Sequence, residues 1–458
     1  MSRETPNADF VYQPEFRVNN TDSPTVPVGL ANPTVDRLLD LFEFSDKVQL
    51  RENDIYGLSK RCQLFRDLFG TIYDSRGGLY VDAVFQAGGE EKLRRVRDAV
   101  SKMESFLYPY FSKDYHIQTL TGLLRSYNGQ RGIVISTGNT HYRYALHLIQ
   151  SLRMVLNCTL PIEVFYNGVK DLSANRAAAL KAISGVRVVD LSKMLNPVGI
   201  GGWSMKPFMI LFSSFSEVIF MDADALFLQD PAVLFQQKGY IETGAVLFRD
   251  RTLLLQDIAG KRVNYTLSIV PSPSDKVVHG RLFRNMSTDE GDSGVLVFDK
   301  ARTFHVLLLN SKMNTDYFKK DFYKAFHGDK ETFWIAFEAM KTPYFMSPNG
   351  GGAVGFLDPD NNYVCGGLYH PDENRQPLWF NGGIVPNKRF EGDDAFNLTH
   401  WATDSTWHNV SWITDTETKP SCMRPAKSED MGLLKGPYAE AAKGIIRVWN
   451  EVVRPLTT

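Results

Sequence analysis

The sequence has few cysteines, almost no net charge and no long apolar run, and each absence excludes a class of protein. No CxxC pair occurs, which argues against a zinc site or a thioredoxin-like motif. Lys plus Arg total 51 and Asp plus Glu total 52, so the net charge of −1 gives no reason to expect a polyanionic partner. No run of 18 apolar residues predicts a membrane span. The amino terminus, MSRETPNADF, lacks the layout of a signal peptide.

The residues that are present indicate a packed globular chain with two or three lobes. Hydrophobic residues make up 43% of the 458 residues and charged residues 22%. The cysteines permit up to two disulfides, in three connectivities, or free buried thiols; they are Cys62, Cys158, Cys365 and Cys422.

Glycosylation sequons are in mild excess over the roughly three expected by chance. Their asparagines are Asn19, Asn157, Asn264, Asn285, Asn397 and Asn409. The excess is compatible with the lumen of the secretory pathway. In that case a chain without an anchor is expected to be the lumenal part of a larger protein, or to be delivered in another way.

The residue composition and the spacing of apolar residues change along the chain and predict four parts. Residues 1–30 are rich in Pro, Asn, Thr and Ser and are expected to be a flexible stem. Residues 31–128 show apolar spacing near 3.6 and predict a helical N-terminal lobe. Residues 129–345 are expected to form a catalytic α/β domain. Residues 346–458, rich in Gly, Pro, Asn and Trp, predict acceptor-side loops and a closing helix.

Short apolar strands alternate with helical stretches from residue 131 onward, which predicts a mainly parallel, Rossmann-like sheet with helices on both faces. The first strand, GIVIST, is followed at once by a glycine. Ligands of such sheets lie at the carboxyl ends of the strands. Thr137 and Gly138 are therefore expected to contact a bound ligand.

A pair of carboxylates at the end of a buried strand is the most informative feature. The continuous apolar run VIFM predicts a strand covered on both faces, and it ends in Asp222-Ala223-Asp224. Two carboxylates at such a place repel each other, and a divalent cation removes that repulsion. Mg²⁺ and Mn²⁺ prefer carboxylate oxygens together with those of a substrate phosphate. The spacing therefore favours a metal that bridges the protein and a diphosphate.

Two other sequence motifs are weak evidence for a functional site. Roughly two D-x-D triplets are expected by chance in this composition, and two occur. The second, Asp358-Pro359-Asp360, lies among turn residues and predicts a loop. The segment NGGGAVGF satisfies G-x-G-x-x-G, but a proline precedes it and no helix follows, so a flexible loop is expected there as well.

Five segments together resemble the fungal Golgi α-mannosyltransferases of glycosyltransferase family 71. They are SMKPFMILFSSFSEVIFMDADALFLQDPAVLF, GYIETGAVLFRDRT, DSGVLVFDK, HGDKETFWIAFE and PLWFNGG, in that order along residues 130–385. The resemblance implies a GT-A fold, GDP-mannose as the donor and Mn²⁺ (or Mg²⁺) as the metal. It also implies a mannoside or glycan acceptor, retention of the α configuration, and a type II membrane protein of the Golgi. The family includes both α-1,3- and α-1,2-mannosyltransferases, and α-1,3 linkage is favoured.

The resemblance also implies roles for individual residues. Asp222 and Asp224 fall on the metal-binding D-x-D, and Lys206 is expected to contact the donor unless it is an exposed helix-start lysine. His370 is expected as a third metal ligand, with His400 and His408 as competitors and a hydrogen-bonded loop histidine as the alternative.

Three further carboxylates are candidate catalytic residues. Asp292 is expected to bind acceptor hydroxyls, and Asp329 and Glu331 to face the anomeric carbon, with helix capping as their alternative. Retention requires either a carboxylate nucleophile or a front-face route, and both stay open. Trp334 and Trp379 are candidates for stacking on sugars or for core packing.

Three alternatives to this function are a transferase for another nucleotide sugar, a phosphatase of the haloacid-dehalogenase type, and a non-catalytic glycan-binding or scaffold subunit of a Golgi complex. The phosphatase motif also places D-x-D after four apolar residues. However, Leu226 stands where that motif has Thr or Val, and the pair follows a later strand than the first.

Overall fold

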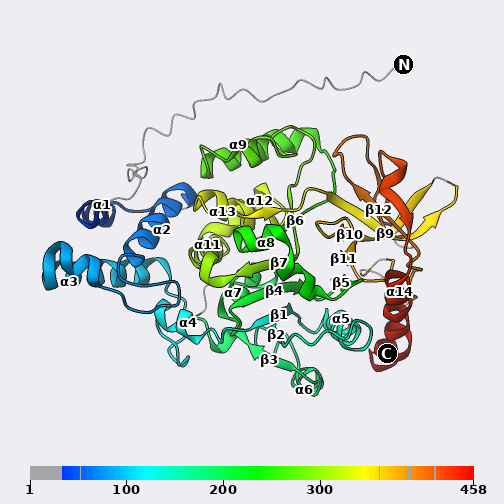
Figure 1. Cartoon of the computed structure of the whole chain (residues 1–458), viewed down its shortest axis with the longest axis horizontal. Coiled ribbons are helices and arrows are strands. Elements are labelled where there is room, and N and C mark those ends of the chain that lie inside the picture. Colours follow the sequence, from blue (N-terminus) through cyan, green and yellow to red (C-terminus); the bar gives the residue numbers. More distant parts are fainter. Residues whose placement is uncertain are drawn as a thin grey trace.

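A seven-stranded sheet lies at the centre of the molecule, with helices on both faces (Figure 1). It is seen in a computed structural model that describes residues 34–457 except 52, 197–198, 361, 387, 389–393 and 417–418. The predicted stem, residues 1–30, lies outside the described residues.

The central sheet has the strand order β3-β2-β1-β4-β7-β6-β8. Strands β3, β2, β1 and β4 are parallel to one another, whereas β7 runs antiparallel to both β4 and β6. The bounds are β1 (Arg131–Ser136), β2 (Ile162–Tyr166), β3 (Val186–Asp190), β4 (Glu217–Asp222), β6 (Ala245–Arg249), β7 (Gly291–Asp299) and β8 (Phe345–Met346).

Side chains of the buried strands alternate between two hydrophobic cores. On β1, Ile133 and Ile135 pack toward α5 (Tyr142–Met154) and α14 (Pro437–Val448), whereas Val134 packs toward α7 (Lys206–Phe212), α11 (Lys300–Met313) and α13 (Lys330–Ala339). Such a sheet, covered by helices on both faces, is the α/β architecture expected from the sequence. The prediction of a mainly parallel α/β sheet with helices on both faces is confirmed.

The amino-terminal helices are α1 (Val35–Lys47), α2 (Ile55–Phe69), α3 (Asp82–Leu107) and α4 (Leu120–Ser126), drawn in blue and cyan in Figure 1. Of these helices, α2 packs on α11, and α1 and α3 pack on α2. Phe65 and Leu68 of α2 belong to the same hydrophobic core as Leu308 of α11. The helical segment therefore shares one core with the central sheet, and the four-part division of the chain stays a prediction.

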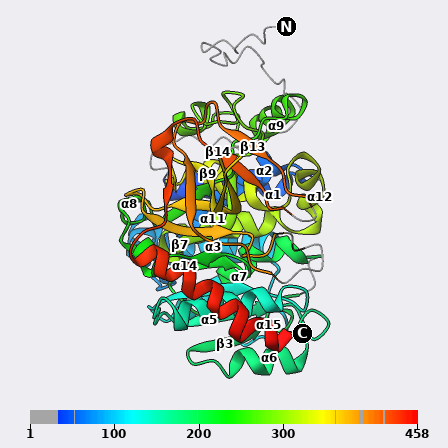
Figure 2. The same cartoon turned by 90° about the vertical axis from the view of Figure 1, so that its right-hand side faces the viewer.

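The carboxyl-terminal part differs from the loop-rich segment that its composition predicts, because it contains a second, antiparallel sheet of order β13-β14-β10-β9-β12-β15 (Figure 2). Its strands are β9 (Gly350–Asp358), β10 (Tyr363–Pro371), β12 (His400–Asp404), β13 (Ser411–Ile413), β14 (Cys422–Arg424) and β15 (Met431–Leu433). A further strand, β11 (Pro377–Asn381), joins β10 to β5 (Leu226–Phe227).

Close packing explains why glycine-rich sequence forms strands here. A Cβ atom on Gly352 would lie 2.0 Å from the carbonyl oxygen of Ala402, and one on Gly355 would lie 1.9 Å from that of Cys365. Only glycine permits this approach of neighbouring backbones. The expected loop over NGGGAVGF is therefore wrong, since these residues begin β9.

The remaining helices are α6 (Ala174–Lys181), α8 (Lys238–Thr243), α9 (Gln256–Ile269), α10 (Asp275–Val278), α12 (Asp316–Ala325) and α15 (Arg454–Thr457). A disulfide between Cys365 and Cys422 joins β10 to β14, and Cys62 and Cys158 are buried free thiols. Within the described part of the chain, every helix is too short or too polar to cross a bilayer.

Candidate functional site

A cleft of about 970 Å³ opens between the central sheet and the second sheet. One wall carries Thr137, Gly138, Lys206, Asp222 and Asp224, and the other comes from β10, β13 and the loop before β14. A volume of this order is typical of ligand sites and large enough for a nucleotide sugar. The cleft therefore brings together all the residues predicted to hold the donor.

The parallel pairing of β1 and β4 places two of the predicted groups at one edge. Ser136 of β1 pairs with Asp222 of β4, so the residues that follow the two strands emerge side by side. Gly138 lies close to a third carboxylate, because a Cβ atom there would be 2.3 Å from Oδ1 of Asp171. This edge of the sheet therefore gathers several carboxylates where ligands of such sheets bind, and glycine at position 138 leaves room for Asp171.

Lys206 is buried and is not the exposed helix-start lysine of the alternative interpretation. It begins α7 and is only 4% exposed. Its Nζ donates to Oδ2 of Asp222 at 2.9 Å and to the carbonyl oxygen and Oγ of Ser293 at 3.1 and 3.0 Å. It also lies 3.7 Å from Oδ2 of Asp329. Burial alone would lower the pKa of Lys206, but the two carboxylates outweigh burial and raise that pKa.

Asp224 forms an ion pair with Lys388, which no sequence motif pointed to. The backbone N–H of Gly383 donates to the carbonyl oxygen of Asp224 at 2.9 Å, so the Gly382-Gly383 segment holds Lys388 near this wall. Burial lowers the pKa of Lys388 to about 8, against the opposing charge of Asp222. Each aspartate of the D-x-D triplet is therefore matched by one lysine.

Two of the predicted catalytic carboxylates lie behind the cleft wall. Asp329 precedes α13 without capping it through its side chain, and burial raises its pKa to about 6 although Lys206 is near. Glu331 is fully buried and accepts the backbone N–H groups of Glu290 and Gly291 at 2.9 and 3.0 Å. Burial raises the pKa of Glu331 to about 7. Neither carboxylate lines the cleft.

The third carboxylate, Asp292, pairs with the predicted metal ligand. Oδ2 of Asp292 lies 2.9 Å from Nε2 of His370, and its Oδ1 accepts the backbone N–H of Gly294 at 2.9 Å. The imidazole is 1% exposed and stacks on Trp379, with ring centroids 4.2 Å apart. His370 is thus not brought together with Asp222 and Asp224, and no cluster of three metal-binding side chains occurs among the residues that the structure describes.

The side chains at the D-x-D triplet provide only some of the ligands that a divalent cation needs. Two carboxylates are present, and burial raises the pKa of Asp222, a charge cost that a cation would relieve. Mg²⁺ and Mn²⁺ commonly take one or two carboxylates and complete their shell with water and substrate phosphates. The residues therefore fit such an ion if the donor supplies the remaining ligands.

The opposite wall carries polar groups that sequence reasoning missed. Trp412 of β13 lines the cleft, the guanidinium of Arg251 lies 5.3 Å from its ring centre, and Arg251 donates to Oγ of Ser421 at 3.3 Å. The indole N–H of Trp412 is buried and has no hydrogen-bond partner in the described part of the chain. Trp334 and Trp379, the expected stacking residues, are only 1% and 0% exposed and pack in the cores.

Comparisons with known proteins find a family and several relatives that this chain resembles. The model of a family described as "Mannosyltransferase putative" matches residues 130–372, just over half of the chain. The chain is 24% identical over 312 residues to "Alpha-1,3-mannosyltransferase MNN1" of Saccharomyces cerevisiae, which covers 55% of this chain and 40% of that protein. It is 27% identical over 282 residues to "Alpha-1,2-mannosyltransferase MNN5" of the same yeast, which covers 52% and 48%.

The chain spans about two-fifths of the length of the curated relatives it matches. Among solved structures, the mannosyltransferase Ktr4p from S. cerevisiae in complex with GDP aligns at 9% identity with a TM-score of 0.29, over 53% of this chain and 76% of that one. The glycosyltransferase GlyE of Streptococcus pneumoniae aligns at 15% identity with a TM-score of 0.31, over 48% and 45%.

Proposed function

Because the chain belongs to the mannosyltransferase family whose model matches residues 130–372, we propose that it transfers α-mannose from GDP-mannose to a mannoside or glycan acceptor. The cleft carries this proposal, since it gathers Thr137, Gly138, Lys206, Asp222 and Asp224 at the carboxyl edge of a mainly parallel sheet. The relatives favour an α-1,3 linkage, and the exposed sequons are compatible with work in the Golgi lumen.

The positive charges of the cleft would stabilise a diphosphate leaving group. Lys206 and Lys388 lie beside Asp222 and Asp224 and bring positive charge to the donor wall. Mn²⁺ or Mg²⁺ bound by the two aspartates would act as a Lewis acid that stabilises the GDP leaving group. The two lysines would keep the diphosphate oriented and add to the electrostatic stabilisation of the developing charge.

The arrangement of carboxylates favours the front-face route of retention. Within the described chain, the cleft is lined by Asp171, Asp222, Asp224 and Asp415, whereas Asp292, Asp329 and Glu331 lie outside its lining. On this route the bond from the anomeric carbon to the diphosphate breaks, and the acceptor oxygen bonds to that carbon on the same face. The acceptor proton passes to a diphosphate oxygen, so no enzyme nucleophile is required.

A donor and acceptor panel tests the function. The chain is incubated with Mn²⁺, an α-mannoside and, in separate reactions, GDP-mannose, UDP-galactose or UDP-glucose, and the product linkage is determined by NMR. We expect transfer only in the reaction that contains GDP-mannose, and a single new α-linkage in its product. Transfer only from a UDP-sugar would favour another transferase, and saturable GDP binding without any transfer would favour a scaffold subunit. Release of phosphate from an aryl phosphate would favour the phosphatase.

Replacing Trp412 with alanine is expected to weaken acceptor binding. Its half-buried ring lines the cleft opposite the donor wall, a suitable place for a sugar ring to stack. Loss of such a contact should raise KM for the mannoside roughly tenfold and leave KM for GDP-mannose unchanged. Steady-state kinetics with each substrate varied measure this.

Trp407→Ala is the matched control. Trp407 donates from Nε1 to the carbonyl oxygen of Pro348 and packs on Arg249, outside the lining of the cleft. It should leave both KM values unchanged. Equal effects of the two substitutions on KM for the acceptor would place the acceptor elsewhere.

A further inference from the structure

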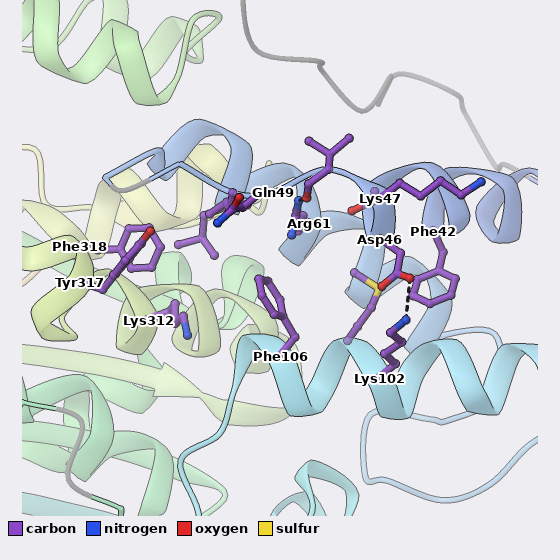
Figure 3. A pocket seen from close by; sticks show the side chains of 15 residues that line it. Phe42, Asp46, Lys47, Gln49, Arg61, Lys102, Phe106, Lys312, Tyr317 and Phe318 are labelled. Carbon is purple, nitrogen blue, oxygen red and sulfur yellow. Dashed lines mark hydrogen bonds and ion pairs between the residues drawn. The ribbon is translucent and has the colours of Figure 1, made fainter.

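A second cavity, of about 600 Å³, lies in the helical part of the molecule (Figure 3). It is enclosed by α1, α2 and α3 on one side and by α11 and α12 on the other. None of its lining residues lines the cleft, and most of them precede the region that the family model matches. The proposed transfer reaction therefore has no use for this cavity.

The walls of the cavity are mainly apolar and aromatic. Phe42 of α1, Phe106 of α3, and Tyr317 and Phe318 of α12 surround it (Figure 3). Two of these rings remain accessible, because Phe106 is 55% exposed and Tyr317 is 47% exposed. Exposed aromatic rings around a cavity provide a contact surface for an apolar group.

Two cations of the cavity form no ion pair among the described residues. Arg61 donates to the backbone carbonyl oxygen of Val48 and lies 5.3 Å from the ring centre of Phe106, and the carboxylates of Asp54 and Asp46 act on it only at longer range. Lys312 makes neither an ion pair nor a hydrogen bond in the part of the chain that the structure describes. By contrast, Lys102 at the same cavity forms an ion pair with Asp46 at 2.6 Å.

Burial makes these two charges unfavourable. Loss of hydration lowers the pKa of both Arg61 and Lys312, and at Arg61 the charges of Asp54 and Asp46 offset only part of that effect. A partly desolvated cation without a counter-charge is destabilising, and an anion that enters the cavity would remove that cost.

We propose that this cavity binds a small amphipathic carboxylate, with its anionic group attracted to Arg61 and Lys312 and its apolar body packed on Phe106 and the rings of α12. The chemistry required is one negative charge on an aromatic or aliphatic body that fits about 600 Å³. The site is independent of GDP-mannose and of the transfer reaction.

Isothermal titration calorimetry with 2-naphthoate tests the proposal on the full chain. The neutral analogue 2-naphthalenemethanol and inorganic phosphate are titrated in parallel. We expect 2-naphthoate to bind at least roughly tenfold more tightly than either, because only it combines the charge with the apolar body. Equal affinity for the alcohol would overturn the role of the cations, and equal affinity for phosphate would overturn the role of the aromatic walls. Failure of 2-naphthoate to bind would end the proposal.

Lys312→Met is the decisive variant. It keeps the length of the side chain and removes the charge, so affinity for 2-naphthoate should fall roughly tenfold. Without ligand its Tm should rise slightly, because an unpaired, partly desolvated cation is gone. Lys319→Met on α12, which removes an ion pair with Asp316 outside the cavity, is the matched control and should bind like the unchanged chain.

Phe106→Ala provides a second variant at an exposed ring, where folding is not at risk. It should weaken binding of 2-naphthoate and leave the Tm unchanged. Unchanged affinity in both Lys312→Met and Phe106→Ala would show that the probe binds elsewhere.

Discussion

Replacing Asp224 with asparagine is expected to lower turnover with GDP-mannose by roughly 10²–10³-fold, the usual loss when one preorganised electrostatic group is removed from an active site. Asp224 lines the cleft two residues beyond the end of β4. The substitution removes a negative charge that would hold a divalent cation against the leaving diphosphate. Initial rates at saturating donor and a series of Mn²⁺ concentrations measure the loss, and the concentration of Mn²⁺ for half-maximal rate should rise.

The second D-x-D triplet of the chain supplies the matched control. Asp360 is exposed in the turn that follows β9 and lies outside the cleft lining. Asp360→Asn should therefore leave the rate and the Mn²⁺ dependence unchanged. An Asp224→Asn variant that turned over like the Asp360→Asn variant would place the metal and the leaving group at another site.

The ion pair with Lys388 suggests a second way in which Asp224 could act. If Asp224 served only to position that lysine, Lys388→Met would reproduce the loss of rate and the double variant would be no worse than either single one. If Asp224 binds a metal, Lys388→Met should leave the Mn²⁺ dependence unchanged. The cycle of the two single variants and the double variant separates these cases.

The donor wall of the cleft was predictable from the sequence because it depends on local patterns. A continuous apolar run predicts a buried strand, and parallel strands end at the same edge, so Asp222 and Asp224 had to lie near Thr137 and Gly138. The helix before β4 likewise had to begin near that edge, which places Lys206. Each of these inferences needs only the order of strands and helices along the chain.

The remainder of the site depends on contacts between residues far apart in the sequence. Lys388 and Trp412 reach the cleft only because the second sheet folds back over the first, and no local pattern records that. His370 was assigned from its place in the sequence, but the pleat of β10 turns its side chain toward Trp379 and Phe248. The positions of β10 that do line the cleft are Gly366, Gly367 and Leu368.

The largest expected effect on stability belongs to Lys206. Lys206→Met removes the counter-charge of the partly buried carboxylate of Asp222 and the buried carboxylate of Asp329, and removal of one partner from a buried ion pair destabilises proteins by about 3–5 kcal/mol. Turnover should also fall, because Asp222 then loses the ammonium group that orients it. Denaturant unfolding and initial rates measure the two effects.

The destabilisation should depend on pH with a definite sign. The pKa of Asp329 is already raised by burial to about 6, and loss of the Lys206 charge raises it further. A carboxyl whose folded pKa lies above its unfolded value stabilises the fold at low pH and loses that contribution as the pH rises through the folded pKa. The difference in unfolding free energy between the unchanged chain and Lys206→Met should therefore be smaller at pH 5 than at pH 8. Adding Asp329→Asn should recover part of the loss at pH 8.

Lys300 is the matched control for a buried lysine. It is fully buried on α11, and its ammonium donates to the carbonyl oxygen and the hydroxyl of Ser213. No carboxylate pairs with it in the described part of the chain, and burial lowers its pKa well below the usual value. Glu163 acts on Lys300 only at longer range and keeps Arg187 as its own ion-pair partner, so Lys300→Met should destabilise less than Lys206→Met and leave turnover unchanged. If the two substitutions lowered stability equally and with the same pH dependence, the loss would come from packing alone. The carboxylates behind the cleft wall would then not depend on Lys206.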